Sequence, residues 1–180
     1  MAAYRAGDAS AFRELYERYS PVLYRMMLRD LRRPEEARDL VQQTFLQLHR
    51  ARNDFDPSQR LRPWIFTIAL NLKREHFRRV KRRPESPLEG EALERVADPV
   101  GGDGRVEATR ALRVGLAELP RDQREVIELH WFEGLPFSEV AQVVGASLSA
   151  VKVRAHRGYT RLRHLLEPPS SDSSAPAGVK

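Results

Sequence analysis

The sequence of 180 residues contains no cysteine. It therefore cannot form disulfides, use a thiolate nucleophile, or hold zinc or an iron–sulfur cluster through cysteine ligands. Aromatic residues make up only 8% of the chain, and no apolar run approaches the roughly 18 residues of a membrane span. The N-terminus also lacks the pattern of a signal peptide. We therefore expect a soluble, cytoplasmic protein that binds no metal and needs no cofactor.

Positive charge is what the chain has in excess. Lys and Arg number 31 against 25 Asp and Glu, a formal net charge of +6, which favours a polyanionic partner. Residues 60–83 hold nine basic residues and one acid, whereas residues 84–109 hold seven acids and two basic residues. A second basic segment, residues 150–164, has five Lys or Arg and no acid. This distribution indicates two nucleic-acid contacts separated by an acidic linker.

The first half of the sequence predicts four helices. Asp8 is a good N-cap for the first, and Pro21 suits the first position of the second. A third helix should begin at Pro34, and a fourth, from about Leu61, should run into the basic segment. The residues at helical spacing that the first helix should bury are Phe12, Leu15, Tyr16 and Tyr19.

Helical periodicity extends over almost the whole chain, and no segment alternates as a strand would. We therefore expect an all-α fold of two small helical domains, a four-helix domain over residues 1–83 and a second domain over residues 105–166. Residues 84–104 are rich in Pro, Gly and acids, which is typical of a flexible linker. Residues 167–180, rich in Pro, Ser and Ala, should form a disordered tail.

Residues 136–163 have the spacing of a helix-turn-helix motif. Ala141 allows close packing, Gly145 can adopt the left-handed conformation that ends the first helix, and Ser147 is a good N-cap for the second. Val151 falls where the second helix must face the first. The inward positions of this second helix are Leu148, Val151 and Ala155. Its outward positions are Ser149, Lys152, Val153, His156 and Arg157.

A basic second helix of this kind usually lies in the major groove of DNA. A short helical hairpin can also be plain bundle architecture with a solvated basic face, so the motif alone leaves both interpretations open. A role of His156 as a metal ligand is disfavoured, because no cluster of further ligands accompanies it.

Three further segments carry a resemblance to a known family. They are Asp-Leu-Val-Gln-Gln-Thr-Phe-Leu-Gln-Leu-His-Arg at 39–50, Arg-Pro-Trp-Ile-Phe-Thr-Ile-Ala-Leu-Asn at 62–71, and Leu-Pro-Arg-Asp-Gln-Arg-Glu-Val-Ile-Glu-Leu-His-Trp-Phe-Glu-Gly at 119–134. In this order, and with the helix-turn-helix that follows, the chain resembles the bacterial extracytoplasmic-function (ECF) RNA polymerase sigma factors of the sigma-70 family over about residues 7–166.

The resemblance implies a non-catalytic protein that directs core RNA polymerase to promoters in response to an envelope or stress signal. Its implied partners are core polymerase, promoter DNA and an anti-sigma factor. Residues implied to bind polymerase are Asp39, Gln42 and Gln43, the last standing where the family often has Glu. Residues implied at the upstream promoter element are Ser149, Lys152, Val153, Arg154, His156 and Arg157. Residues implied at the downstream element are Phe55, Asp56, Ser58, Gln59, Arg60, Asn71, Lys73, Arg74 and Arg78.

Two other classes of protein compete with this interpretation. A helix-turn-helix transcriptional regulator with an N-terminal sensing or dimerisation domain would explain residues 136–163 equally well. It would not explain the basic segment at residues 60–83 or the match at 62–71. An enzyme acting on nucleic acid is disfavoured, because the sequence shows no carboxylate cluster for two metals, no Gly-rich phosphate loop and no nucleophile–base pair.

Overall fold

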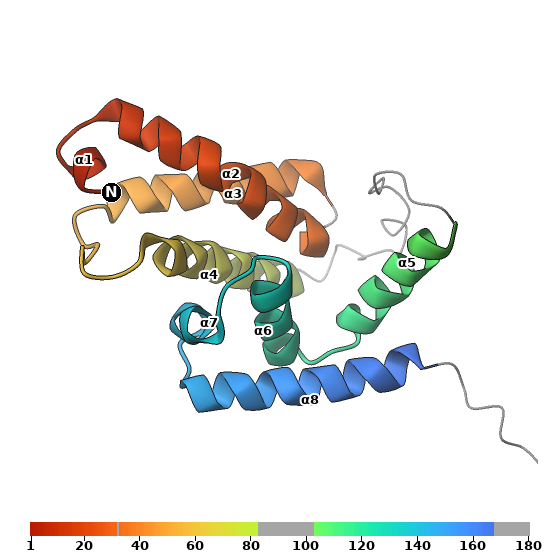
Figure 1. Ribbon diagram of the computed structural model, residues 1–180. Helices are drawn as coiled ribbons and strands as arrows, with labels where there is room; N and C mark the ends of the chain where they lie inside the picture. The colour runs from red at the N-terminus through yellow and green to blue at the C-terminus, as the bar shows by residue number, and fades with distance from the viewer. Residues whose placement is uncertain (32, 83–102, 168–180) are drawn as a thin grey trace, which may run out of the picture.

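The computed structural model describes residues 1–31, 33–82 and 103–167 (Figure 1). Within these ranges every regular element is a helix, so the all-α expectation is confirmed. The helices of the N-terminal domain are α1 (Ala2–Arg5), α2 (Ala9–Leu31), α3 (Pro34–Arg50) and α4 (Leu61–Arg82). Those of the C-terminal domain are α5 (Asp103–Ala117), α6 (Arg121–Trp131), α7 (Phe137–Val144) and α8 (Leu148–Leu166).

In the N-terminal domain, α2, α3 and α4 lie side by side, and the short α1 packs on α2 (Figure 1). The α3 stripe of Leu40, Val41, Phe45 and Leu48 is buried against its neighbours. Pro34 occupies the start of α3, as the sequence predicts, with acidic residues in the first turn. These three helices form the frame on which the basic residues of α4 are mounted.

The expected break at Pro21 is wrong, because the two predicted helices are one, α2. Pro21 lies on the exposed side of α2, so the hydrogen bond that it cannot donate is lost where water can satisfy the carbonyl. Leu15 and Leu23 are buried on either side of it and hold the helix continuous. Asp8 does cap the start, since its Oδ1 accepts from the Ser10 backbone N–H at 2.8 Å. Tyr16 departs from the expected stripe and is exposed.

In the C-terminal domain the predicted helix-turn-helix is present as α7 and α8. Gly145 ends α7 with φ at +68°, and the Ser147 hydroxyl caps α8 by accepting from the Ala150 N–H at 3.2 Å. Val151 is fully buried against α7, as predicted, whereas Leu148 is exposed, contrary to expectation. Leu148 is the first residue of α8, so its side chain lies at the edge of the helix contact.

A glycine sets how closely α8 approaches α6. Gly158 is buried in α8, and a Cβ built on it would lie 2.7 Å from Cδ1 of Ile127. The absence of a side chain at this position therefore lets the two helices pack closely. This contact orients the long α8 across the C-terminal domain.

The two domains pack directly on one another, α4 against α7 (Figure 1). One continuous cluster of buried apolar residues spans both domains and includes Phe66 and Leu70 from α4 and Val140 from α7. The expected linker lies outside the described residues except for its last two, which belong to α5. The expected tail likewise lies outside them except for Glu167, which follows α8.

Candidate nucleic-acid interface

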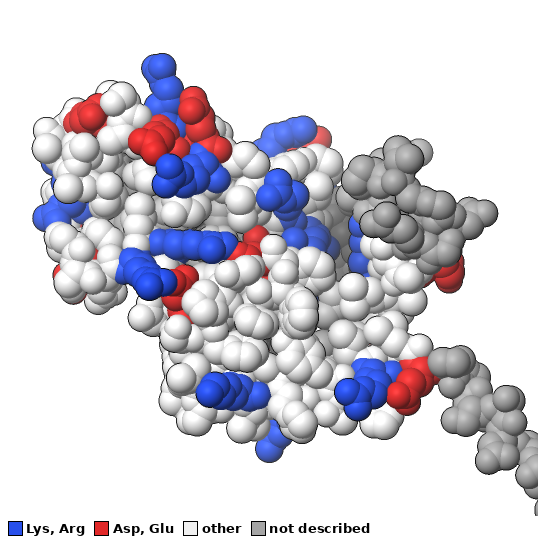
Figure 2. All heavy atoms as spheres, in the orientation of Figure 1, with Lys and Arg blue, Asp and Glu red and all other residues white. Residues whose placement is uncertain are grey.

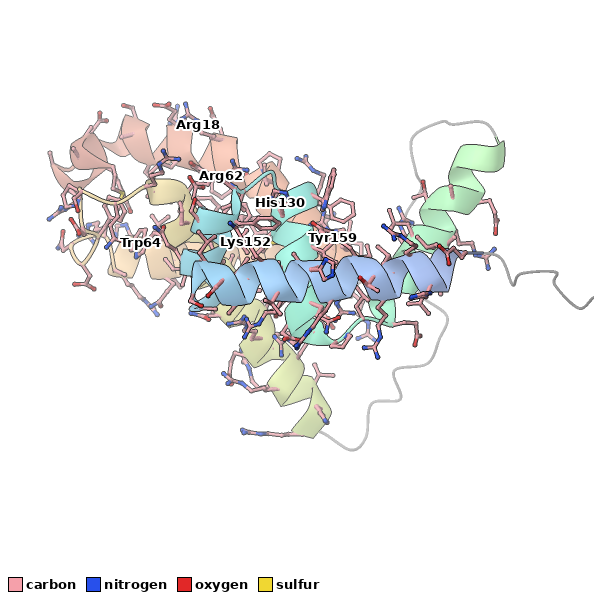
Figure 3. The ribbon with its side chains drawn as sticks, turned by 60° about the horizontal axis from the view of Figure 1, so that its bottom comes forward. Arg18, Arg62, Trp64, His130, Lys152 and Tyr159 are labelled. Carbon is pink, nitrogen blue, oxygen red and sulfur yellow. The ribbon has the colours of Figure 1, made fainter. Side chains whose placement is uncertain are left out.

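α8 presents an exposed basic face on the side of the molecule away from the N-terminal domain. Figure 3 views the molecule from this side, with α8 crossing in front and with Lys152 and Tyr159 labelled on it. Val151 and Ala155 are buried on the inner face, so the intervening positions point to solvent. The exposed predicted residues are Ser149, Lys152, Val153, His156 and Arg157. A helix anchored on one face and cationic on the other has the shape and charge that fit a major groove.

Arg154 differs from its neighbours on α8. It is partly covered, and its Nε lies 3.4 Å from a carboxylate oxygen of Asp122 in α6. A pair this exposed is weak. Arg154 is therefore available at the side of the helix, where a phosphate contact would replace that carboxylate.

The loop between α3 and α4 is organised by one carboxylate. Asp56 accepts hydrogen bonds from the Ser58 N–H at 2.9 Å, from the Ser58 hydroxyl at 2.8 Å and from the Gln59 amide at 3.4 Å. The Ser58 bonds hold the pKa of Asp56 below its ordinary value. Asp56, Ser58 and Gln59 are all exposed. The predicted specificity loop is thus a formed surface turn.

Phe55 is the one predicted loop residue that the structure does not place on the surface. Its side chain is only 6% exposed, and its ring centroid lies 5.0 Å from that of Trp64. Arg5 also donates to the Phe55 carbonyl at 3.3 Å. Phe55 therefore anchors the loop to the domain, and its expected place in direct contact with DNA does not fit this arrangement.

The predicted site residues of α4 fall into two groups. Asn71 and Arg78 are exposed, and Arg78 pairs with Glu75 one turn earlier on the same helix. Lys73 is only 3% exposed and Arg74 is partly covered, so neither presents a free cation to solvent. The expectation that Lys73 belongs to an open cationic surface is wrong for this arrangement, because carboxylates surround it.

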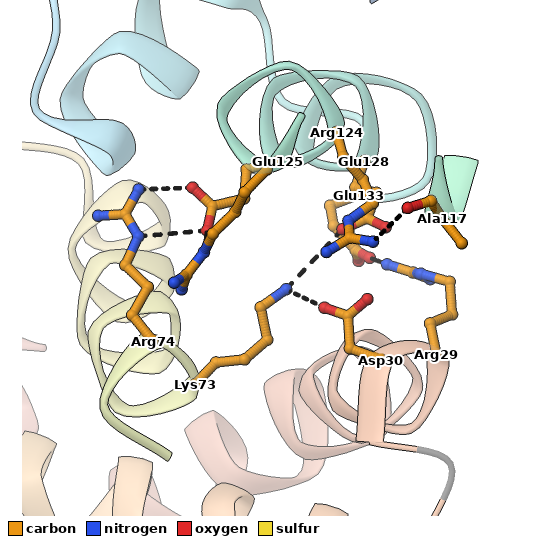
Figure 4. A network of polar contacts seen from close by, with 10 residues as sticks. Arg29, Asp30, Lys73, Arg74, Ala117, Arg124, Glu125, Glu128 and Glu133 are labelled. Atoms are coloured by element: carbon orange, nitrogen blue, oxygen red, sulfur yellow. Dashed lines mark hydrogen bonds and ion pairs between the residues drawn. The ribbon is translucent and has the colours of Figure 1, made fainter. Parts of the chain in front are cut away.

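The carboxylates that cover Lys73 and Arg74 come mainly from the C-terminal domain (Figure 4). Arg74 donates to both oxygens of Glu125 in α6, at 3.2 and 2.6 Å. The Lys73 ammonium donates to Asp30 of α2 and lies 3.8 Å from Glu128 of α6. Arg60, before α4, pairs with Glu139 of α7 at 2.6 Å. Figure 2 shows basic and acidic side chains next to each other along the middle of the molecule, where α4 faces α6 and α7.

Two further arginines of the N-terminal domain, which the sequence did not single out, join this boundary. Arg29 of α2 pairs with Glu133, and its guanidinium carbon lies 4.7 Å from the centroid of the Phe132 ring. Arg62 of α4 donates to the backbone carbonyl of Glu133. The glutamates Glu125, Glu128, Glu133 and Glu139 were missed because an acidic side chain is normally solvated. The only available signal was the spacing of Glu125 and Glu128, which places both on one face of α6.

The pKa values of Glu128 and Asp30 are shifted in opposite directions. Burial and, after it, the nearby charge of Asp30 raise the pKa of Glu128 to about 7, against the opposing effect of Lys73. Burial also tends to raise the pKa of Asp30, but the charge and hydrogen bond of Lys73 hold that pKa below its ordinary value. The Lys73 ammonium lies nearer Asp30 than Glu128. Of the two acids, Glu128 is therefore the one that is more readily protonated.

The predicted polymerase-binding residues lie together on the outer face of α3. Asp39, Gln42 and Gln43 are exposed, while Leu40 and Val41 are buried on the opposite face. Leu46, one turn further on, is exposed as well and was not anticipated. A surface of this composition, polar with one apolar side chain, is suited to a protein partner.

No group of three or more His, Asp or Glu side chains suited to a metal ion occurs in the part of the chain that the structure describes. Within the same part, no helix is long and apolar enough to cross a membrane.

Comparison with known proteins identifies both domains. Residues 15–83 match the family model of Sigma-70 region 2, and residues 109–162 match that of Sigma-70, region 4. The RNA polymerase sigma factor CarQ of Myxococcus xanthus is 35% identical over 166 residues, which cover 92% of this chain and 95% of CarQ. The ECF RNA polymerase sigma factor SigM of Mycobacterium tuberculosis is 31% identical, over 92% of this chain and 82% of its own.

Solved structures agree. CnrH, in complex with the cytosolic domain of CnrY, superimposes with a TM-score of 0.70 at 30% identity, covering 92% of this chain and 93% of CnrH. The sigma factor RpoE, in complex with the anti-sigma factor NepR from Bartonella quintana, gives a TM-score of 0.68 at 25% identity, covering 88% and 98%. The chain belongs to the ECF sigma factors of the sigma-70 family. It is therefore a promoter-recognition factor of RNA polymerase, and the match of region 2 excludes the alternative of a regulator with an unrelated sensing domain.

Proposed function

We propose that this sigma factor divides its work among three surfaces: the outer face of α3 for core polymerase, the 55–60 loop with α4 for the downstream promoter element, and α8 for the upstream element. The observation that carries the proposal is α8, whose inner residues Val151 and Ala155 are buried while Lys152 and Arg157 stand free in solvent. Arg and Lys pair well with guanine in the major groove, so these two side chains would supply sequence recognition.

The downstream surface would combine the exposed loop with the exposed side of α4. Ser58 and Gln59 offer polar groups on a turn fixed by Asp56, and Asn71 offers an amide. Groups of this kind can hydrogen-bond a base that has left its stack. Arg78, with Arg60 and Arg74 once their carboxylate partners are released, would hold the backbone.

We further infer that the protein works in the cytoplasm under the control of an anti-sigma factor that responds to an envelope or stress signal. Support for this comes from RpoE, whose structure was determined with the anti-sigma factor NepR and which aligns over 88% of this chain.

The proposal is tested at the polymerase surface. Asp39→Arg places a cation in the middle of the exposed α3 face and should greatly reduce co-purification with core polymerase, while helical content stays unchanged. Glu35→Arg is the matched control, since Glu35 is an exposed acid in the first turn of the same helix. Assembly of the Asp39 variant at the level of the control would show that the outer face of α3 does not bind polymerase.

Activity itself is tested by transcription with core polymerase on a promoter library, with start sites mapped. The proposal requires core-dependent initiation from a consistent pair of promoter elements. Tight binding of the isolated chain to duplex operator, with no core-dependent transcription, would overturn it.

A further inference from the structure

Among the described residues, the charged side chains that are most deeply buried all lie at the boundary between the two domains. They are Lys73, Glu125, Glu128, Glu133 and Glu139. Removing a charge from water is costly unless a partner replaces the lost hydration. A boundary that buries five charges therefore depends on how they are paired.

The ion pairs at this boundary mainly join acids of one domain to cations of the other. The four buried glutamates belong to the C-terminal domain, and the cations that meet them belong mainly to the N-terminal domain. Glu125 receives a two-bond contact from Arg74 and a further bond at 2.8 Å from Arg121 of its own helix. Two-bond contacts of this kind are the geometry by which arginine also holds phosphate. The acidic residues thus form a row that presents carboxylates where a nucleic-acid backbone would present phosphates.

Apolar side chains also line this contact. Met26 and Leu70 from the N-terminal domain and Leu129 from the C-terminal domain line the same space as Lys73 and Glu128. All three apolar side chains are almost fully buried. Apolar burial next to the ion pairs gives the closed arrangement a source of stability that salt does not screen.

We propose that the acidic row of Glu125, Glu128, Glu133 and Glu139 is an internal substitute for the DNA backbone. It occupies the cations of the N-terminal domain, so that the free protein covers its own downstream-element surface. The inference rests on the proposed function, which assigns Arg60 and Arg74 to that surface. Phosphates and the acidic row compete for the same cations, and binding of DNA there requires the domains to separate. α8 lies outside the boundary and stays open in the closed protein.

The test removes carboxylate charge without removing shape. Glu125→Gln/Glu139→Gln in the full-length chain should raise affinity for a labelled random-sequence single-stranded 12-mer by about 5- to 150-fold, the usual range of coupling between two linked equilibria. The increase in 12-mer affinity that comes from net charge alone is measured with the control variant Glu107→Gln/Glu118→Gln, which changes two exposed acids of the same domain. Equal affinities for the two double variants would overturn the proposal.

Domain separation is measured independently of DNA affinity. Because the chain has no cysteine, spin labels can be placed at Glu17→Cys in α2 and Gln142→Cys in α7, both exposed. The unaltered boundary should give one short, narrow distance distribution, which shifts to longer distances when the 12-mer is added or when the two boundary glutamates are changed. A distance distribution that is changed neither by the 12-mer nor by the two glutamate substitutions would also overturn the proposal. If core-dependent transcription is observed while the 12-mer affinity and the spin-label distances stay unchanged, the protein does not cover its own downstream-element surface, but the proposed function stands. If transcription fails as well, the function is wrong.

Discussion

α4 and α8 are the two basic helices of this protein, and they are alike in sequence but opposite in environment. Within the described residues, Lys73 and Arg74 of α4 are held by carboxylates of other helices, whereas Lys152 and Arg157 of α8 have no acidic partner. The difference arises from what faces each helix. Among the described acids of α6 and α7, Glu125, Glu128 and Glu139 face α4, whereas Asp122 reaches α8 at Arg154. A cluster of basic residues therefore marks an anion-binding surface only where the fold leaves it uncovered.

The largest expected effect comes from breaking the pairing on α4. Lys73→Met should lower the free energy of unfolding by about 3–5 kcal/mol, because Asp30 is then left buried without its cation. Lys152→Met on α8 should change it by less than about 0.5 kcal/mol, since its side chain is exposed. Urea unfolding of both variants gives the comparison. Similar losses would mean that the two helices do not differ in this way.

Next in size is a pH effect confined to the α4 side. Glu128 has its pKa raised to about 7 by burial, so its contribution to stability is complete below about pH 4.5 and is lost as the pH rises through 7. The groups that act on it are Asp30 and Arg29 of α2, Lys73 of α4 and Arg124 of α6. The free energy of unfolding should fall by roughly 1–3 kcal/mol between pH 5 and pH 8.

Glu128→Gln keeps the shape of the protonated acid and should remove that part of the slope. Unfolding is measured in urea at several pH values, and the difference between the two proteins cancels the titration of histidines. Asp30 and Glu125 do not contribute in this window, because their pKa values are held low by Lys73 and by Arg74 with Arg121, and they lose stability only in acid. Parallel pH profiles would show that Glu128 is ionised throughout.

On the α8 side the comparison is sharpened by separating recognition from general affinity. Arg157→Ala should cost about 1–3 kcal/mol on the preferred upstream element and relax the base preference at one position. Arg163, further along the exposed face, should serve phosphate, so Arg163→Ala should weaken all sequences equally and lower the salt dependence by about one counterion. Binding to a randomised upstream-element library measures both. A uniform loss for Arg157→Ala would show that α8 holds DNA without recognising sequence.

The sequence predicted well what is decided locally. Gly145 and Ser147 form the turn because a left-handed residue and an N-cap are needed within a few positions, and both were anticipated. Pro21 was misjudged because burial on either side of it, a tertiary effect, overrides the local preference to begin a helix. The covering of Lys73 could not be predicted at all. Its acidic neighbours are 43 and 55 positions away. The packing of α2 on α4 brings Asp30 to Lys73, and the packing of one domain on the other brings Glu128 there.

The smallest expected effect concerns Asn71, the exposed residue on α4 beside the covered cations. Asn71→Ala should leave stability within about 0.5 kcal/mol, because an exposed helix position tolerates alanine well. Assembly with core polymerase should also be unchanged. Formation of the open complex should weaken by roughly 0.5–1.5 kcal/mol, the net worth of one hydrogen bond to an unstacked base. Permanganate reactivity of the downstream element measures it. Unaltered reactivity would make Asn71 an ordinary surface residue, and the function of α4 in opening would then rest on its arginines alone.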